Sequence, residues 1–264
     1  MKKYLLIFNF QTLLITVLSL LSCYVTVYFQ FKIFSDFLLI GLLILFPLTF
    51  TMREAFRRRE RSLQYLSLLK ASLQSVYYSF QNSSLEESKK TEFGNLANNL
   101  SVSLMQYLSG ASTEVAAVER ARQALITFIL QNKKAIKKIS DKILLFVFRT
   151  NESLEFLLAV RRHNTPWGPR TIILLAIYLF AIFYPPSALF QGGAGLKMWN
   201  LFFMTVFKVL ILISFYNVQV LMEDPFDPKS PDGIRLNDFQ FSRETISAAR
   251  LPSMVLPPQI NKMN

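Results

Sequence analysis

The sequence predicts an all-α, polytopic membrane protein with four transmembrane helices in two hairpins and a helical, membrane-proximal cytoplasmic domain. Three observations lead to this fold class: four long apolar stretches, a one-sided distribution of basic residues, and the lack of strand-like alternation in the central region. The 264 residues are 52% hydrophobic and include 25 Phe, whereas globular proteins average only about 45–50% apolar residues even when Gly is counted. The excess apolar surface is therefore predicted to face lipid.

The four apolar stretches are long enough to cross a hydrocarbon core of about 30 Å, which takes about 20 residues in helical form. They run over residues 4–29, 33–50, 171–190 and 199–221. The first stretch is also compatible with a cleaved signal peptide, since two lysines precede it and Ser22-Cys23 resembles a lipoprotein cleavage site. The apolar run continues to Phe29, however, and only Gln-Phe-Lys separates it from the second stretch. This spacing favours a helical hairpin.

The basic residues test this topology independently, because loops on the cytoplasmic side are enriched in Lys and Arg. Of the 29 basic residues, 26 lie before the first stretch, between Arg53 and Arg170, or after the fourth stretch. The two hairpin loops contain one each, Lys32 and Lys197. Both termini and the central region are therefore expected on the cytoplasmic, matrix or stromal side. The net charge of +12 follows from this topology, and no nucleic-acid partner is expected.

These boundaries divide the chain into four predicted segments. They are a first transmembrane hairpin (1–52), a helical cytoplasmic-side region (53–170), a second transmembrane hairpin (171–222) and a cytoplasmic-side C-terminal tail (223–264). Trp167 precedes the third stretch and Trp199 opens the fourth, and Trp is enriched at both membrane–water interfaces. We therefore expect a multi-pass integral membrane protein in contact with the lipid bilayer.

The central region is expected to be helical because its apolar residues recur at helical spacing. The second helix is predicted to continue out of the membrane, since leucines recur at intervals of three and four residues. They are Leu63, Leu66, Leu69 and Leu73. Residues 81–95 are polar and rich in Ser and Asn, which predicts a linker. Gly110 is expected to end the next helix, since Gly is common just past a helix C-terminus.

The residues that most enzyme mechanisms need are scarce in this chain. It contains one histidine, His163, and one cysteine, Cys23. A nucleophile–base arrangement and a Cys/His metal site are therefore not indicated, and no phosphate-binding or dinucleotide motif occurs. We predict no enzyme activity, no catalytic residue, no cofactor and no metal site, and we interpret His163 as a surface or interfacial residue.

Lys208 is unusual because it lies inside the fourth apolar stretch. It is about 13 Å along the helix from Trp199, at about 1.5 Å per residue. Burying an ammonium at mid-membrane costs about 2.5–3.5 kcal/mol on insertion scales. A water-filled pore, a polar partner such as Asp36, or snorkelling to the nearer interface would each offset this cost.

A cluster of arginines follows the second apolar stretch. It contains Arg53, Arg57, Arg58, Arg59 and Arg61. The simplest interpretation is a topology determinant that also contacts anionic lipid head groups. A second interpretation is an electropositive mouth that attracts anions to a pore.

Two patches of the sequence carry a family resemblance. The fourth stretch ends in Glu-Asp-Pro-Phe-Asp (223–227), followed by Asp-Gly-Ile-Arg-Leu (232–236), and residues 34–56 contain a central Gly41 and an arginine–aromatic exit. With the layout of two hairpins around a basic helical insert, these patches resemble the bestrophin family of anion channels. In that family the second helix lines the pore, and the last membrane helix leads into an Asn-Pro-Phe type of motif. The resemblance implies an oligomeric chloride channel that is pentameric in the family.

The resemblance also implies roles for particular residues where positions match. The implied pore and neck residues are Phe34, Leu38, Leu42 and Lys208, and the implied anion-mouth residues are Arg53, Arg57 and Arg58. The first three neck positions are four residues apart and are expected on one helical face, although lipid-facing or helix-packing roles fit them equally. Calcium-gated members bind calcium through an acidic run, which Lys229 and two extra prolines interrupt here. A calcium-independent relative is therefore implied.

Two further points leave the function open. The family's Phe-Arg-Thr-Asn-x-Ser signature occurs at 148–153, but in the family it closes helix two, so we interpret this match as a coincidence or a warning about register. The alternative to a channel is a non-catalytic accessory or structural subunit of an organellar membrane complex. Such a subunit needs no axial pore and packs its spans against foreign chains. The many Phe residues favour this contact, whereas Lys208 favours a wet interior.

The segment from Glu223 to Asp238 is predicted to dock against the cytoplasmic helices of its own chain or of a neighbouring subunit. Its acidic residues emerge on the side that holds the arginine cluster, and its prolines lower the entropy lost on docking. The predicted docking motif is Asp224, Pro225, Phe226 and Asp227, with Phe226 as the apolar anchor.

Overall fold

The structure, a computed structural model, describes residues 8–34, 36–163, 167–192, 197–228, 230 and 232–242. These residues form α-helices and short 3-10 helices and contain no β-strand, which confirms the all-α prediction. The elements are α1 (Phe10–Phe29), α2 (Phe37–Gln81), α3 (Glu87–Ser109), α4 (Val115–Gln131), η2 (Lys137–Ile139), α5 (Ser140–Arg162), α6 (Trp167–Gly192), α7 (Met198–Met222) and η4 (Leu236–Phe239).

Four helical stretches are long and apolar enough to cross a membrane, as predicted, and they contain α1, α2, α6 and α7. The chain divides into two compact units. Among the described residues, the first unit comprises the chain up to Tyr65 and Phe156–Arg235, and the second comprises Leu66–Glu155 and the residues from Leu236 onward. Helices α2 and α5 contribute residues to both units. The four segments predicted from the sequence (1–52, 53–170, 171–222 and 223–264) describe on which side of the membrane each part lies. The two compact units do not test this division, which stays a prediction.

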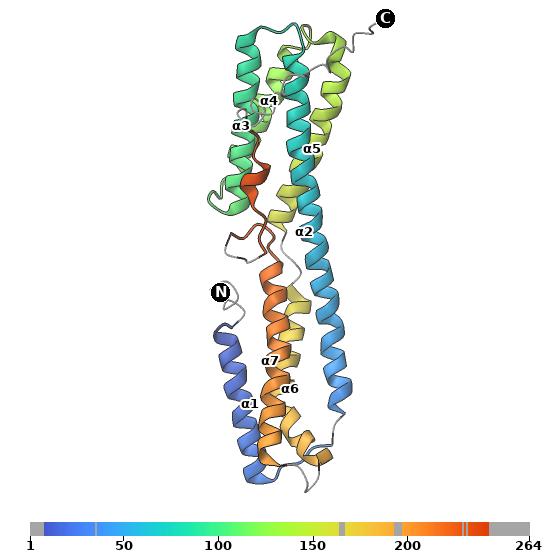
Figure 1. The fold of residues 1–264 in the computed structure, drawn as a ribbon, viewed down its shortest axis with the longest axis vertical. Coiled ribbons are helices and arrows are strands. Elements are labelled where there is room, and N and C mark those ends of the chain that lie inside the picture. The colour runs from blue at the N-terminus through green and yellow to red at the C-terminus, as the bar shows by residue number, and fades with distance from the viewer. Residues whose placement is uncertain are drawn as a thin grey trace, which may run out of the picture. The chain divides into compact units, whose positions relative to one another are not determined.

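Helix α1 lies beside α6 and α7 in the first unit (Figure 1). Asn9 caps its N-terminus, where its side chain accepts a hydrogen bond from the Thr12 backbone N–H at 3.0 Å. Gln30 ends the helix in a left-handed conformation with φ 51°. The buried face of α1 carries mostly small residues, which let apolar helices approach closely. These residues are Thr12, Ile15, Ser19, Cys23 and Thr26.

The core of the first unit consists of aliphatic and aromatic side chains from α1, α2, α6 and α7. Its members are Ile15, Ile44, Leu48, Ile173, Ile177, Phe180, Ala181, Tyr184, Val209, Leu212, Ile213 and Tyr216. Their spacing of three or four residues along α6 and α7 gives each helix one buried face. The opposite faces are left to lipid or to another chain.

Two consecutive prolines, Pro185 and Pro186, lie inside α6. Because proline has no N–H, the carbonyl four residues earlier loses its helical partner. For Pro186 this carbonyl belongs to Ile182, and the hydroxyl of Ser22 in α1 donates a hydrogen bond to it at 2.5 Å. The Ile33 N–H donates to the Pro186 carbonyl at 3.4 Å. Neighbouring segments thus satisfy polar backbone groups of α6, as an apolar environment requires.

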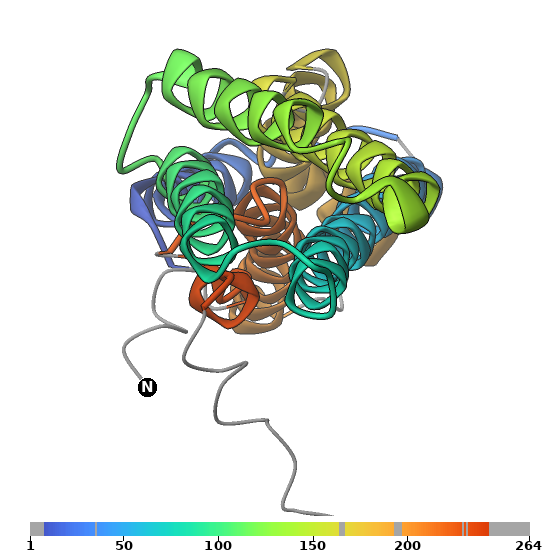
Figure 2. The ribbon, with the colours of Figure 1, turned by 90° about the horizontal axis from the view of Figure 1, so that it is seen from above.

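The second unit has an aromatic centre where α2, α3 and α4 contribute one phenylalanine each. The ring centroids of Phe80 and Phe93 are 4.6 Å apart, and Phe128 lies 6.1 Å from both. The predicted leucine face of α2 is confirmed for three of its members, which are fully buried. They are Leu66, Leu69 and Leu73. Beside α3 lies η4 (Figure 2), and the following Phe241 N–H donates a hydrogen bond to the Ser101 hydroxyl at 2.8 Å.

The polar linker between α2 and α3 is shorter than predicted. Residues 81–95 were expected to be a linker, but α3 begins at Glu87. Phe93 and Ala97 are fully buried one helical turn apart, so the apolar spacing outweighs the polar composition of this stretch. Gly110 ends α3 in a left-handed conformation with φ 78°, as predicted.

Candidate functional site

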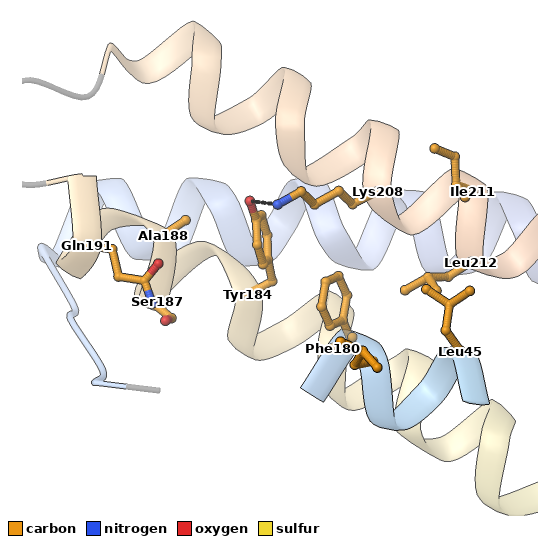
Figure 3. Close-up of a pocket in the computed structure, with 11 residues that line it drawn as sticks. Leu45, Phe180, Tyr184, Ser187, Ala188, Gln191, Lys208, Ile211 and Leu212 are labelled. Carbon is orange, nitrogen blue, oxygen red and sulfur yellow. Dashed lines mark hydrogen bonds between the residues drawn. The ribbon is translucent and has the colours of Figure 1, made fainter. Parts of the chain in front are cut away.

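A cavity of about 460 Å³ lies between α2, α6 and α7 in the first unit (Figure 3). It is lined by Gly41, Leu42, Leu45, Phe180, Tyr184, Ser187, Ala188, Gln191, Lys208, Ile211 and Leu212. Small-molecule sites typically have volumes of about 300–1,000 Å³ and are mostly apolar with a few placed polar groups. The cavity has this size and composition, and Lys208 is the charged residue among the described side chains that line it.

Lys208 pairs with a tyrosine of the neighbouring helix. Its Nζ donates a hydrogen bond to the Tyr184 Oη at 2.8 Å and lies 4.5 Å from the centre of the Tyr184 ring. A hydroxyl and a ring face stabilise an ammonium without neutralising it. A polar partner was one of the three alternatives considered, and it is Tyr184 and not the suggested Asp36. The Asp36 carboxylate instead accepts a hydrogen bond from the Leu39 N–H at 3.3 Å, at the start of α2.

The position of Tyr184 is set by the packing of α6. Its ring stacks on that of Phe180 with centroids 5.1 Å apart, and only 9% of the residue is exposed. On α7, Thr205 and Val209 are fully buried, while Lys208 lies on the exposed side of the helix. A helical side chain leans toward the N-terminus of its helix. This direction brings the lysine ammonium to the level of the tyrosine hydroxyl.

The cavity is polar at one end and apolar at the other. Figure 3 shows Ser187 and Gln191 on one side of the lysine–tyrosine pair, and Phe180, Leu45 and Leu212 on the other side. The two polar residues lie about one and two turns beyond the tyrosine along α6. The polar end therefore points toward the hairpin end of α6, and the apolar end points toward the middle of the apolar helices.

The predicted neck residue Phe34 does not lie on a face of α2 with Leu42. Phe34 precedes α2, which begins at Phe37, and it lines a separate apolar hollow of about 430 Å³. Leu42 and Lys208 line the cavity between α2, α6 and α7. The side chain of Leu38 lies outside the described part of the structure. The expectation of a common face was wrong for Phe34, because the helix begins only after it.

Two of the predicted anion-mouth arginines lie on the exposed side of α2. Arg53 borders an apolar hollow of about 410 Å³. Arg57 forms a salt bridge with Glu54, with Nη1 and Oε1 3.2 Å apart. Part of the positive charge of this surface is therefore offset by an acid one helical turn away.

Arg58, the third predicted mouth residue, stabilises the end of α5. Its Nη2 donates hydrogen bonds to the backbone carbonyls of Val160 and, at 2.6 Å, of His163. The last carbonyls of a helix carry partial negative charge, which a guanidinium stabilises. Arg58 also borders a hollow of about 310 Å³ with Arg61 and His163.

The segment after α7 packs against other parts of the first unit, to which it belongs as far as Arg235. Phe226 is 1% exposed. The Asp224 Oδ2 accepts a hydrogen bond from the Arg161 Nη1 at 2.6 Å, and its Oδ1 accepts one from the Phe226 N–H at 3.0 Å. The Glu223 Oε2 lies 3.4 Å from the Arg170 Nη1. These contacts are the kind that a docked segment needs, and its role in assembly stays a prediction.

The same segment closes on itself through backbone hydrogen bonds. The Ile234 N–H donates to the Pro225 carbonyl at 2.9 Å, and the Ser230 N–H donates to the Asp227 carbonyl at 3.1 Å. A Cβ added to Gly233 would lie 2.4 Å from the Asp227 carbonyl oxygen. Only glycine fits this position without a backbone shift.

Sequence reasoning missed the partners of the charged residues it singled out. Nothing in the sequence marks Tyr184, since its contact with Lys208 depends on the register between α6 and α7. Arg161 and Arg170 had a usable signal, because they precede the third apolar stretch on the side where the acidic residues 223–224 emerge. Matching basic and acidic residues at helix ends on the same side of the membrane would have identified these two arginines as partners of the acids.

Comparisons with known proteins show similarity in structure and not in sequence. No protein-family model matches the chain, and no curated protein is significantly similar to it. A bacterial bestrophin homologue from Klebsiella pneumoniae, solved by Zn-SAD phasing, matches with a TM-score of 0.75 and 16% identity over 87% of this chain and 93% of that chain. A single-site variant of a bestrophin homologue from the same organism matches with a TM-score of 0.76 and 16% identity over 90% and 93%. A variant described as a membrane protein matches with a TM-score of 0.76 and 15% identity over 90% and 95%.

The match includes nearly the full length of both chains, so it covers both compact units and the apolar helices. The predicted resemblance is confirmed at the level of the fold. The chain has the fold of the bacterial bestrophin homologues.

Proposed function

We propose that this protein is the subunit of an oligomeric anion channel, with chloride as a permeant ion. The observation that carries the proposal is the fold match to bestrophin homologues over 90% of the chain. The bestrophin family resembled by the sequence conducts anions, and the basic cluster after the apolar part of α2 supplies positive charge that attracts them.

Burial of the apolar helices supports an assembly of several copies. Only 17% of the residues in the most apolar part of α2 are buried, compared with 39% in the corresponding parts of α6 and α7. A helix with so little cover within its own chain requires lipid, a pore or a neighbouring copy along its length. We propose a ring of copies, a pentamer as in the family, in which α2 lies nearest the axis.

The proposed orientation places the basic central region and both termini on the cytoplasmic side. Trp167 and Trp199 are 78% and 85% exposed at the N-terminal ends of α6 and α7. These antiparallel neighbours thus offer one aromatic anchor to each interface. Labelling of single cysteines at positions 58 and 197 in sealed vesicles tests the orientation. The two positions are expected to react from opposite sides, and reaction from one side contradicts the topology.

We further propose that conduction does not require calcium. The first two acids after α7 are engaged by arginines, since Arg161 pairs with Asp224 and Arg170 pairs with Glu223. A guanidinium at a carboxylate competes with a metal ion for the same oxygens. This arrangement supports a structural role for the acids.

Chloride efflux from proteoliposomes tests the proposed function. Purified protein in chloride-loaded liposomes is expected to release chloride when a potassium ionophore balances the charge, at the same rate with calcium or with a calcium chelator. Liposomes with heat-denatured protein are the control. Absence of efflux from a preparation that imaging shows to be a folded ring would contradict the channel, and calcium-dependent efflux would contradict the calcium proposal alone.

A further inference from the structure

We infer that the cavity between α2, α6 and α7 binds a single-chain fatty acid, whose carboxylate contacts Lys208 and whose acyl chain lies along the apolar end. The inference goes beyond the proposed channel and does not depend on it, because it rests on the contacts of the cavity alone.

Charge is the first argument for an anionic ligand. An ammonium among apolar helices is costly unless an opposite charge or water meets it. Tyr184 lies at hydrogen-bond distance from Lys208 but is neutral, and none of the described residues lining the cavity is acidic. An ammonium has three N–H donors, so a carboxylate oxygen can join the tyrosine hydroxyl as a second acceptor. The ligand then supplies the charge that the cavity lacks.

The distribution of polar groups is the second argument. Ser187 and Gln191 lie on the side of Lys208 that faces the hairpin end of α6, and Phe180, Leu45 and Leu212 lie on the other side (Figure 3). A molecule with a polar head and an apolar tail matches this order along one axis. An inorganic anion would leave the apolar end unfilled.

Size and access favour one acyl chain from the bilayer. A volume of about 460 Å³ is in the range of single small-molecule sites. Leu42 and Ile211 at its edge are 47% and 39% exposed, so within a single chain the cavity is open at the side of α2 and α7. Tyr184 lies about 12 Å before the end of α6, at about 1.5 Å per residue. A phospholipid would have to draw its phosphate and two chains to this depth, whereas a fatty acid brings only a carboxylate.

Photolabelling of the full chain in phosphatidylcholine nanodiscs tests the inference. The probe is palmitate with a diazirine at the end of its chain, and mass spectrometry locates the labelled peptide. Labelling is expected in the peptides that contain Leu45 or Leu212. Unmodified palmitate is expected to compete, and methyl palmitate, which lacks the charge, is expected to compete at least tenfold more weakly.

Matched variants separate the charge from general packing. Lys208→Met is expected to lower labelling at least tenfold, and Tyr184→Phe about threefold. Two controls change the same residue types outside the cavity: Lys197→Met at the N-terminus of α7 and Tyr178→Phe on α6. Both variants are expected to be labelled as strongly as the natural protein. Gly41→Leu keeps the lysine but fills the cavity, so it is expected to abolish labelling in a protein whose size-exclusion profile is unchanged.

Two results would overturn the inference. One is equal labelling of the natural protein and Lys208→Met, or equal competition by palmitate and its methyl ester. The other is rapid modification of Lys208→Cys, in a Cys23→Ser background, by a membrane-impermeant thiosulfonate, because that outcome places the residue in an aqueous pore. Neither readout needs ion flux, so failure of the channel proposal would leave this test intact.

Discussion

The C-terminal segment after α7 and the cavity around Lys208 belong to the same unit but differ in how well their space is filled and their charges are paired. In the segment, Phe226 is 1% exposed, Asp224 meets Arg161 at 2.6 Å, and Gly233 has no room for a Cβ. Glu223 and Asp224 each face an arginine, and the space around Phe226 is filled.

The cavity lacks both of these properties. Lys208 has a neutral partner in Tyr184, and about 460 Å³ stays open beside it. A Cβ added to Gly41 would lie 3.9 Å from the Phe180 ring, an ordinary contact distance. The contrast fits a structural role for the segment and the ligand site proposed above for the cavity, because proteins accept local instability mainly where function requires it.

The largest expected effect tests the filled region. Phe226→Ala removes a buried ring and is expected to lower the free energy of unfolding by about 3–5 kcal/mol and to weaken the detergent-resistant oligomer. Asp232→Asn is the control, because Asp232 is exposed and offers its backbone carbonyl, not its side chain, to Arg59. Thermal unfolding and oligomer size measure both variants. Equal behaviour of the two would show that the segment only ends α7.

In the cavity around Lys208, removing a side chain is expected to raise stability and not to lower it. Lys208→Met removes an ammonium that costs about 2.5–3.5 kcal/mol at mid-membrane on insertion scales, so the ligand-free variant is expected to unfold at a higher temperature than the natural protein. Palmitate is expected to raise the unfolding temperature of the natural protein and not that of the variant, since a ligand stabilises only the state that binds it. A lower unfolding temperature for Lys208→Met would mean that the tyrosine contact already satisfies the charge.

A smaller effect concerns the ion pair of the C-terminal segment. Arg161 and Asp224 are 28% and 43% exposed in their side chains, and pairs of this kind contribute at most about 1 kcal/mol. Arg161→Gln is expected to lose about this amount at low salt and less at high salt. A double-mutant cycle with Asp224→Asn isolates the pair, and an unchanged effect of Arg161→Gln in that background would show that the pair contributes nothing.

The smallest expected effect is at Gly41. Gly41→Ala adds a methyl group at ordinary contact distance from Phe180 and replaces glycine inside a helix, which typically gains about 0.5–1 kcal/mol. Chemical denaturation in detergent measures this gain. A loss of more than about 1 kcal/mol would mean that another chain packs closely on this glycine. This face of α2 would then be part of a tight interface between chains.

The architecture was predictable because it follows from composition and spacing. Apolar length defines the membrane helices, and the leucine spacing of α2 predicted its buried face. The linker was wrong because composition alone does not show that Phe93 and Ala97 fall on one face of α3. The start of α2 after Phe34 was also not predicted, since it depends on a hydrogen bond from Leu39 to Asp36.

The site was predictable only in part. The sequence marks Lys208 because a charge interrupts an apolar run, and it marks Phe226 because an aromatic residue sits in an acidic turn. Tyr184 was not predicted, because it is one of several aromatic residues on α6 and only the register with α7 singles it out. The structural role of Arg58 was not predicted either, since its acceptors are backbone carbonyls about a hundred residues away in sequence.

The most direct test of the central claim is the reversal potential of the purified protein in a planar bilayer with a potassium chloride gradient. An anion channel with the bestrophin fold is predicted to reverse close to the equilibrium potential of chloride, with calcium present or chelated. A reversal close to the equilibrium potential of potassium, from a preparation that imaging shows to be a homo-oligomeric ring, would contradict anion conduction while leaving the fold unchanged.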